Sequence, residues 1–221
     1  MPTRQAERSF LERGLQRDRL LWNPPGADLE VFQPTARPPL DSPTILCVGR
    51  WSVRKGCEVL GRAVARQPWR VVHVGSAGDA PLPPIDRFER LDPRPLSEMR
   101  QVYRAAHIFV DPSLDDEITT APLQAAASGL PLVCSDRSRG EDLLAASADS
   151  TAVTVVPALH PATWRDAIAS ALAQAERQTG LRAWLPRAAE QFSWKAYASR
   201  YEQEMKRFLE PPSDGGTRQS P

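Results

Sequence analysis

Two cationic side chains, Arg50 and Lys55, lie in a polar stretch that follows an apolar run closed by Gly49. Cations just ahead of a helix start are suited to bind a diphosphate, because backbone N–H groups and positive side chains then face the same anion. Only three of the 28 basic residues are lysines, which indicates that a compact point charge is wanted at Lys55. The alternative, a solvated turn with no ligand, is left open by the pattern.

A second polar segment spans residues 111–120, between an apolar run and an alanine-rich helix. Thr119 or Thr120 could cap this helix, and Pro122 fits its first turn, where a missing N–H costs little. Backbone donors at the helix start would face a loop at the end of a strand, which predicts an anion site. Three carboxylates of this loop could contact sugar hydroxyls: Asp115, Asp116 and Glu117.

The elements that must position these residues are predicted strands that alternate with helices. Strands are expected at residues 44–48, 70–74, 88–91, 108–110, 132–134 and 152–156, with a further short one at 20–22. Helices are expected at residues 4–15, 57–66, 96–106, 141–146, 162–178, 181–191 and 194–209, with a short one that ends at Gly129. This alternation predicts an α/β fold built on a doubly wound parallel sheet with C-terminal helices.

In a doubly wound sheet, ligands bind where the strands end, near the point at which the strand order reverses. Four pairs of residues fall at the ends of predicted strands, and we expect them to share one rim that carries the site: Gly49-Arg50, Gly75-Ser76, Pro112-Ser113 and Ser135-Asp136. The expected division of the chain is an N-terminal helix and linker at 1–40, a doubly wound sheet domain at 41–192, a closing helix at 193–210 and a disordered tail at 211–221.

Composition excludes several classes of protein. The net charge of +1 argues against nucleic acid or a membrane surface as the main partner. Three cysteines without a CxxC pair are typical of reduced thiols in a cytoplasmic protein, and we find neither a targeting segment nor an integral membrane segment. No metal site is expected, because the acidic loop has no histidine nearby. His73 and His107 border predicted strands and are interpreted as structural residues.

The last predicted helix carries an apolar stripe at intervals of three and four residues: Trp194, Tyr197, Tyr201, Met205 and Phe208. Such a stripe normally covers the core of its own domain. If it is exposed instead, it is a docking face for another domain. The first interpretation is the default, and the second stays open.

Five segments in order resemble one family. They are residues 23–34, 45–56, 103–113, 127–136 and the pair 193–194, and together they carry the likeness from about residue 23 to residue 209. The chain is similar to the C-terminal, donor-binding domain of retaining glycosyltransferases with the GT-B fold, in particular glycosyltransferase family 4 (glycosyl transferases group 1). The resemblance implies a Rossmann-like domain that binds a nucleotide diphosphate sugar, with no cofactor and no metal.

The resemblance also implies roles for individual residues. Asp116 and Gln124 occupy the positions of two family glutamates, and Glu117 begins the stretch that replaces a glycine-rich loop; Asp116 and Glu117 are therefore the catalytic candidates. Gln124 can still hydrogen-bond a ribose hydroxyl but carries no charge. The implied donor-binding residues are Gly49, Arg50, Lys55, Gly75, Arg90, Leu91, Thr119, Thr120 and Gln124, with contacts to the base expected around Arg90 and Leu91.

The implied function is transfer of a hexose with retention, by the donor half of an enzyme of polysaccharide biosynthesis. An acceptor domain is missing from these 221 residues and would be supplied by another chain or by a longer gene product, docking on the C-terminal helix. The alternative is a non-catalytic binding or assembly module derived from such an enzyme. A nicotinamide-dependent reductase is disfavoured, because no strand leads into the glycine fingerprint of dinucleotide sites.

Overall fold

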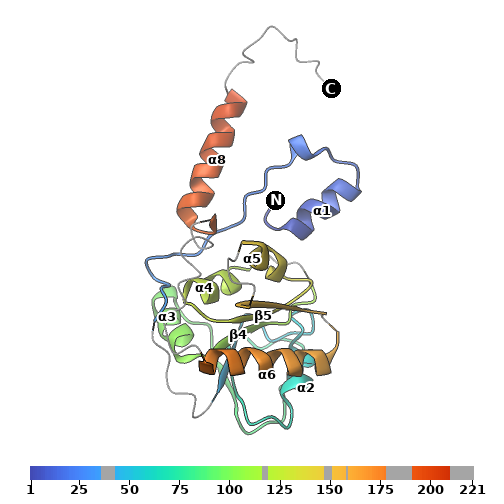
Figure 1. The fold of residues 1–221 in the computed structure, drawn as a ribbon, viewed down its shortest axis with the longest axis vertical. Helices are drawn as coiled ribbons and strands as arrows, with labels where there is room; N and C mark the ends of the chain where they lie inside the picture. Colours follow the sequence, from blue (N-terminus) through green and yellow to red (C-terminus); the bar gives the residue numbers. More distant parts are fainter. Residues whose placement is uncertain (36–42, 116–118, 147–150, 158, 178–190, 210–221) are drawn as a thin grey trace.

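The computed structural model describes residues 1–35, 43–115, 119–146, 151–157, 159–177 and 191–209. At its centre is a six-stranded parallel sheet in the order β3-β2-β1-β4-β5-β6 (Figure 1). The strands are β1 (Thr44–Val48), β2 (Arg70–Val74), β3 (Phe88–Leu91), β4 (Ile108–Asp111), β5 (Leu132–Ser135) and β6 (Val153–Val156). Their order reverses between β1 and β4. The predicted doubly wound, Rossmann-like α/β fold is therefore confirmed.

Helices cover both faces of the sheet, which explains why the four inner strands are buried at nearly every position. One face carries α2 (Cys57–Val64) and α6 (Pro161–Arg177), which contact each other. The other face carries α3 (Leu96–Ala105), α4 (Ala121–Ala127) and α5 (Gly140–Ala146). All four residues of β4 and of β5 are buried.

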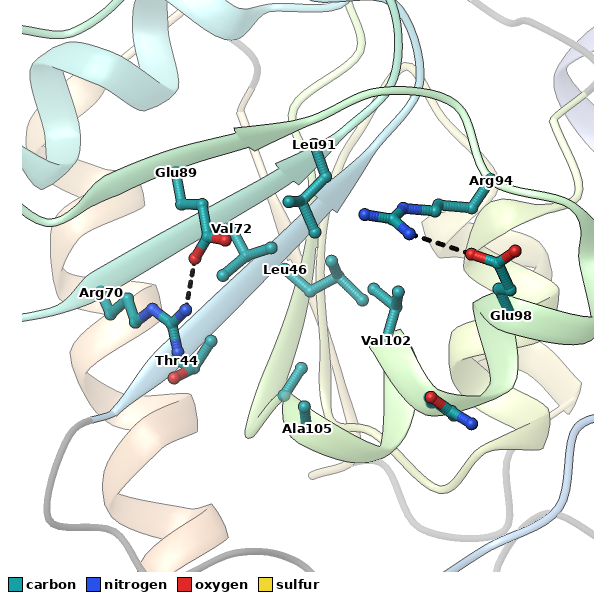
Figure 2. A pocket seen from close by; sticks show the side chains of 12 residues that line it. Thr44, Leu46, Arg70, Val72, Glu89, Leu91, Arg94, Glu98, Val102 and Ala105 are labelled. Atoms are coloured by element: carbon teal, nitrogen blue, oxygen red, sulfur yellow. Dashed lines mark hydrogen bonds and ion pairs between the residues drawn. The ribbon is translucent and has the colours of Figure 1, made fainter.

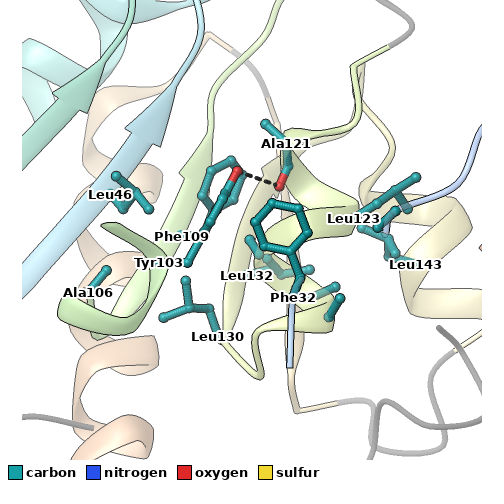
Figure 3. Packing of buried hydrophobic residues seen from close by; sticks show 14 of the residues in the cluster. Phe32, Leu46, Tyr103, Ala106, Phe109, Ala121, Leu123, Leu130, Leu132 and Leu143 are labelled. Atoms are coloured by element: carbon teal, nitrogen blue, oxygen red, sulfur yellow. Dashed lines mark hydrogen bonds between the residues drawn. The ribbon is translucent and has the colours of Figure 1, made fainter. Parts of the chain in front are cut away.

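The core on the face of α3 and α4 is centred on three aromatic rings (Figure 3). Tyr103 packs between Phe32 and Phe109, and its ring meets that of Phe32 edge to face, with 5.4 Å between the ring centroids. Phe32 comes from the linker that precedes the sheet domain, so the linker is part of this core. Buried aromatic rings contribute strongly to such packing.

On the opposite face, Trp51 and Trp164 are the largest buried side chains. The chain runs from β2 to β3 without a helix, and Trp51 compensates by packing under this loop. Its ring contacts His73 and Phe88, and its indole N–H donates to the carbonyl of Pro81 at 3.0 Å. The loop therefore takes the place that a helix would occupy over β2 and β3.

The N-terminal helix α1 (Arg4–Glu12) rests on α5 through ion pairs of Arg4 with Asp142 and of Arg8 with Glu141. It is followed by a short 3₁₀ turn, η1 (Arg17–Arg19). The last helix, α8 (Trp194–Leu209), projects away from the sheet beside the N-terminal segment (Figure 1).

Several predictions of local structure were wrong. Residues 20–22 form no strand, because no neighbouring strand pairs with them. Helix α2 ends at Val64 rather than at Arg66, which adopts a left-handed φ of 66° just before Pro68. Helical spacing places Leu96 on the same face of α3 as Met99, yet Leu96 is 45% exposed whereas Met99 is buried. The helix predicted at 181–191 falls almost entirely outside the described residues, and the tail wholly so.

The default interpretation of the apolar stripe on α8 was also wrong. No described residue of this helix is buried, and Phe208 is 71% exposed. Trp194, Tyr201 and Met205 are exposed as well. The stripe is therefore an open apolar face, as the second interpretation required.

Candidate functional site

A pocket of about 380 Å³ lies at the carboxyl edge of the sheet, where β1 and β2 end. We call it the edge pocket. The turn after β1 and the turn after β2 both contribute to it, and α4 contributes from the other side of the strand-order reversal. The pocket is lined by Val48, Gly49, Arg50, Val74, Gly75, Ser76, Pro93, Arg94, Leu96, Met99 and Gln124. Four of the nine predicted donor-binding residues therefore share one cavity.

Arg50 and Lys55 differ in their surroundings. Arg50 is exposed, and within the described part of the chain its guanidinium forms neither an ion pair nor a hydrogen bond. Lys55 is half-buried and folds back toward the end of β1, since a side-chain carbon at Gly49 would lie 3.7 Å from its Cε. Both cations therefore belong to the same turn, with Arg50 in the pocket wall and Lys55 beside it.

The turn that carries the two cations is fixed by the loop after β4. Gly56 has a left-handed φ of 66°, and an added side-chain carbon there would lie 1.8 Å from the carbonyl oxygen of Pro112. The N–H of Leu114 donates to the carbonyl of Arg54 at 2.9 Å. Only glycine permits this close approach of two backbones. The cationic turn and residues 112–114 are thus held against each other across the strand-order reversal.

The Lys55 ammonium also influences the first residue of α2. The pKa of Cys57 lies below its ordinary value, chiefly because of a hydrogen bond with Cys47, and the positive charge of Lys55 lowers it further. Both thiols are buried in the core and unoxidised. The positive charge of Lys55 therefore stabilises negative charge at the start of α2, the helix that follows the cationic turn.

At the start of α4, the backbone N–H of Ala121 donates to the Thr119 hydroxyl at 3.4 Å, so Thr119 makes the capping contact. Thr120 is the N-cap residue but makes no side-chain cap bond. Gln124 is held on both sides of its amide: its oxygen accepts from the Tyr103 hydroxyl at 2.9 Å, and its nitrogen donates to Thr120 at 3.3 Å. Burial raises the pKa of Tyr103, so this hydroxyl stays protonated as a donor.

Arg90 and Leu91 stand next to the edge pocket rather than in its wall. The Arg90 guanidinium donates to the carbonyl of Gly75 at 3.3 Å, and the N–H of Gly75 donates to the carbonyl of Leu91 at 2.9 Å. The Leu91 side chain instead lines a separate cavity of about 260 Å³ between the sheet and α3, with Leu46 and Val72 (Figure 2). Both residues therefore support the turn after β2.

The two catalytic candidates, Asp116 and Glu117, lie outside the described residues. Their neighbour Asp115 pairs with Arg54 at 3.5 Å, and both side chains are exposed. Across the residues that the structure does describe, no group of three or more acidic, histidine or cysteine side chains could hold a metal ion.

Ser76, predicted to lie on the rim, lines the edge pocket. Two further residues were not foreseen as part of this region. Arg94 also lines the pocket and pairs with Glu98 at 2.9 Å. His73, interpreted as structural, lies directly behind the pocket: its Nε2 is 2.6 Å from the carbonyl oxygen of Gly49. The only sign of this contact in the sequence was that a histidine interrupts the apolar residues at the end of a predicted strand. His107, by contrast, is structural as predicted, since its Nδ1 accepts from the backbone N–H of Thr44.

No helix among the described residues is long and apolar enough to cross a lipid bilayer.

Comparisons with known proteins agree with the fold. The family model of glycosyl transferases group 1 matches residues 42–174. D-inositol 3-phosphate glycosyltransferase of Corynebacterium glutamicum is 32% identical over 212 residues, which cover 82% of this chain and 50% of that protein. The same enzyme of Nocardia farcinica is 32% identical, covering 82% of this chain and 46% of the relative. The chain thus spans about half the length of these curated relatives.

Among solved structures, sucrose-phosphate synthase of Thermosynechococcus elongatus superposes with a TM-score of 0.77 at 23% identity, covering 95% of this chain and 57% of that one. Anabaena HepE in complex with UDP gives a TM-score of 0.73 at 13% identity, covering 93% and 62%. These neighbours show the fold. With a family model that matches more than half of its residues, the chain belongs to the glycosyl transferases group 1 and corresponds to the C-terminal half of a GT-B glycosyltransferase.

Proposed function

We propose that the chain is the donor-binding half of a glycosyltransferase that moves a hexose, with retention, from a nucleotide diphosphate sugar to an acceptor. The edge pocket holds the donor, and the acceptor domain is supplied from outside these residues. No metal takes part in this scheme, because the two cations of the turn after β1 provide the positive charge.

One observation carries the proposal: the turns after β1 and β2 and the helix α4 meet in a single pocket, and the Arg50 guanidinium in its wall has no partner among the described residues. In the first step, Arg50 and Lys55 bind the diphosphate. As the bond to the sugar breaks, negative charge grows on the leaving diphosphate, and fixed cations stabilise this charge without proton transfer. The charge-assisted bonds that an arginine makes to phosphate are among the strong ones.

Gln124 is proposed to receive the ribose. Its amide is oriented by Tyr103 and Thr120, which leaves one N–H and one lone pair for a ribose hydroxyl. Asp116, with Glu117 as the substitute, is proposed to orient the donor sugar. Asp115 precedes them in the loop that packs on the cationic turn, which supports a place near the diphosphate for this acidic segment.

The proposal is tested by thermal unfolding of the purified chain with UDP, GDP and ADP. Ligand that binds only the folded state raises the melting temperature. We expect at least one nucleoside diphosphate at millimolar concentration to do so, and Lys55→Ala to abolish the shift. Lys206→Ala is the matched control, because this lysine is exposed on α8 and pairs only with Glu202 there.

The proposal fails if none of the three nucleotides shifts the melting temperature of the wild-type chain. It fails equally if Lys206→Ala removes the shift as completely as Lys55→Ala does, since the effect would then report net charge alone.

A second function, a non-catalytic binding or assembly module, is favoured by the open face of α8. A helix with no buried residue and several exposed large apolar side chains fits a docking element. We propose that the acceptor domain, on another chain or another part of a longer one, docks here. In the catalytic version, adding this domain restores transfer; in the assembly version, the complex forms and transfers no sugar.

These versions are separated by incubating the purified chain with UDP-glucose, alone and with candidate acceptor-domain proteins. Release of UDP or glycosylated product, followed by chromatography, supports catalysis. A stable complex without turnover supports the assembly module.

A further inference from the structure

His73 is fully buried in the fourth position of β2, where the pattern of the strand calls for an apolar residue. A buried imidazole needs partners for its two nitrogen atoms, or it loses free energy. His73 satisfies only one. Its Nε2 lies 2.6 Å from the carbonyl oxygen of Gly49, and its Nδ1 has no hydrogen-bond partner in the described part of the chain. The one hydrogen bond of this buried ring is therefore made to the backbone of Gly49, at the start of the turn that carries Arg50 and Lys55.

The chemistry of the contact fixes the tautomer. A carbonyl oxygen can only accept, so Nε2 carries the hydrogen and donates it to Gly49. Burial lowers the pKa of His73, and the nearby charge of Arg90 lowers it further. The ring is therefore neutral at pH 7, with a bare Nδ1. Edge-to-face packing against Trp51, with 5.0 Å between ring centroids, holds the ring in this orientation.

The Gly49 carbonyl is confined from a second direction as well. A side-chain carbon at Gly75 would lie 1.8 Å from this oxygen, so the turn after β2 closes directly over it. The N–H of Gly49 donates to the carbonyl of Val74 at 2.9 Å. Both polar groups of Gly49 are thus turned toward β2.

This orientation has a consequence for the next N–H. In a trans peptide the carbonyl and the following N–H point in opposite directions. Because the Gly49 carbonyl points to His73, the N–H of Arg50 points away from β2. That N–H has no hydrogen-bond partner among the described residues, and Arg50 lines the edge pocket. A backbone donor without a partner is costly unless a ligand or water takes it.

We propose that His73 is a positioning residue of the edge pocket: by donating to the Gly49 carbonyl, it holds the Gly49–Arg50 peptide so that the Arg50 N–H binds a phosphate oxygen of the donor. The inference rests on the proposed function, because it assigns this N–H to the same diphosphate. Losing this one donor should weaken binding about tenfold, the effect of one charge-assisted hydrogen bond.

The test is calorimetric titration of UDP, GDP and ADP into the wild-type chain and four variants. His73→Phe keeps the ring but cannot donate, and His73→Asn is too short to reach Gly49; both should bind about tenfold more weakly. In His73→Gln the side-chain amide nitrogen can take the place of Nε2, so binding should stay within about threefold of the wild type. His107→Phe is the matched control, a buried histidine at the opposite end of the sheet whose bond to Thr44 is remote from the edge pocket.

The measured affinities of these variants either support or overturn the inference. Equal affinity of His73→Phe, His73→Asn and the wild type overturns the inference but leaves the proposed function intact. If His107→Phe and His73→Gln lose as much nucleotide affinity as His73→Phe does, the effect is general destabilisation, and the inference is overturned as well. No binding by the wild type overturns both proposals. The tautomer has a readout independent of any nucleotide: ¹⁵N NMR of His73 should show hydrogen on Nε2, and hydrogen on Nδ1 would contradict the geometry.

Discussion

The two ends of the parallel sheet differ in how completely their polar groups are paired. At the amino end, His107 accepts from the N–H of Thr44, and Arg70 pairs with Glu89 across β2 and β3. At the carboxyl end, the N–H and the guanidinium of Arg50 both lack partners among the described residues.

Under the proposed function, the carboxyl end is the end that binds the ligand. Paired groups at the amino end contribute to stability alone. Incomplete groups at the carboxyl end cost stability in the empty chain and become paired when an anion binds. Substitutions at the amino end should therefore change unfolding, and substitutions at the carboxyl end should change binding, apart from those that disturb the backbone itself.

The largest effect is expected from Gly56→Ala at the carboxyl end. The new side-chain carbon would meet the Pro112 carbonyl and require a left-handed φ. We expect the free energy of unfolding to fall by about 3 kcal/mol or more in urea denaturation. Gly14→Ala is the control, because its φ of 90° is also left-handed but nothing lies within 4 Å; it should cost about 1 kcal/mol. Equal losses in the two variants would show that the packing of the two loops is unimportant.

A loss of comparable size is expected from Trp164→Ala in α6, compared with Phe208→Ala in α8. Trp164 is fully buried on the sheet, and its removal should cost about 3–5 kcal/mol at the upper limit of core truncations. Phe208 is 71% exposed, and its removal should change the free energy of unfolding by less than about 0.5 kcal/mol. A large loss in Phe208→Ala would mean that α8 packs on its own domain after all.

The fold of the sheet was accessible from the sequence, and most strand and helix boundaries agree within one or two residues. Short apolar runs closed by glycine or proline determined it, as at Val48 followed by Gly49. Which helix faces are exposed and which are buried was harder to predict from the sequence. Leu96 and the α8 stripe have helical spacing, but spacing cannot tell which face has a partner.

The candidate site divides in the same way. Gly49, Arg50, Gly75 and Gln124 were predicted and share the edge pocket. Ser76 was predicted only as part of the rim, and it lines the pocket too. Arg94 was missed, because nothing in a loop sequence shows which residues a neighbouring turn will meet. The contact of His73 with Gly49 was missed because it joins neighbouring strands 24 residues apart.

A third comparison isolates charge at the carboxyl end. Arg50→Ala should leave the free energy of unfolding of the empty chain unchanged within about 0.5 kcal/mol, because the Arg50 guanidinium is exposed and has no partner among the described residues. It should weaken nucleoside diphosphate binding by about 10–100-fold in calorimetric titration, as expected for a lost charge-assisted hydrogen bond. Arg70→Ala at the amino end should leave binding unchanged. Equal affinities of Arg50→Ala and Arg70→Ala would contradict the division between the two ends.

The smallest effect concerns pH. The pKa of His73 is lowered by burial and by Arg90, despite the bond to Gly49. The unfolded chain, with an ordinary histidine pKa of about 6.5, therefore binds a proton more readily than the folded chain. The free energy of unfolding should fall as pH drops below about 6.5, by at most about 1.4 kcal/mol per unit from this one group. His73→Gln should remove that part of the slope, measured by urea denaturation between pH 7.5 and 5.5; an unchanged slope would contradict the pKa assignment.

The proposed function depends most on where a bound diphosphate lies. A crystal structure of the chain soaked with UDP measures this directly. We expect the phosphate oxygens in the edge pocket, within hydrogen-bond distance of the Arg50 N–H and close to the Lys55 ammonium. A diphosphate bound elsewhere, or Arg50 and Lys55 turned away from it, would contradict the account.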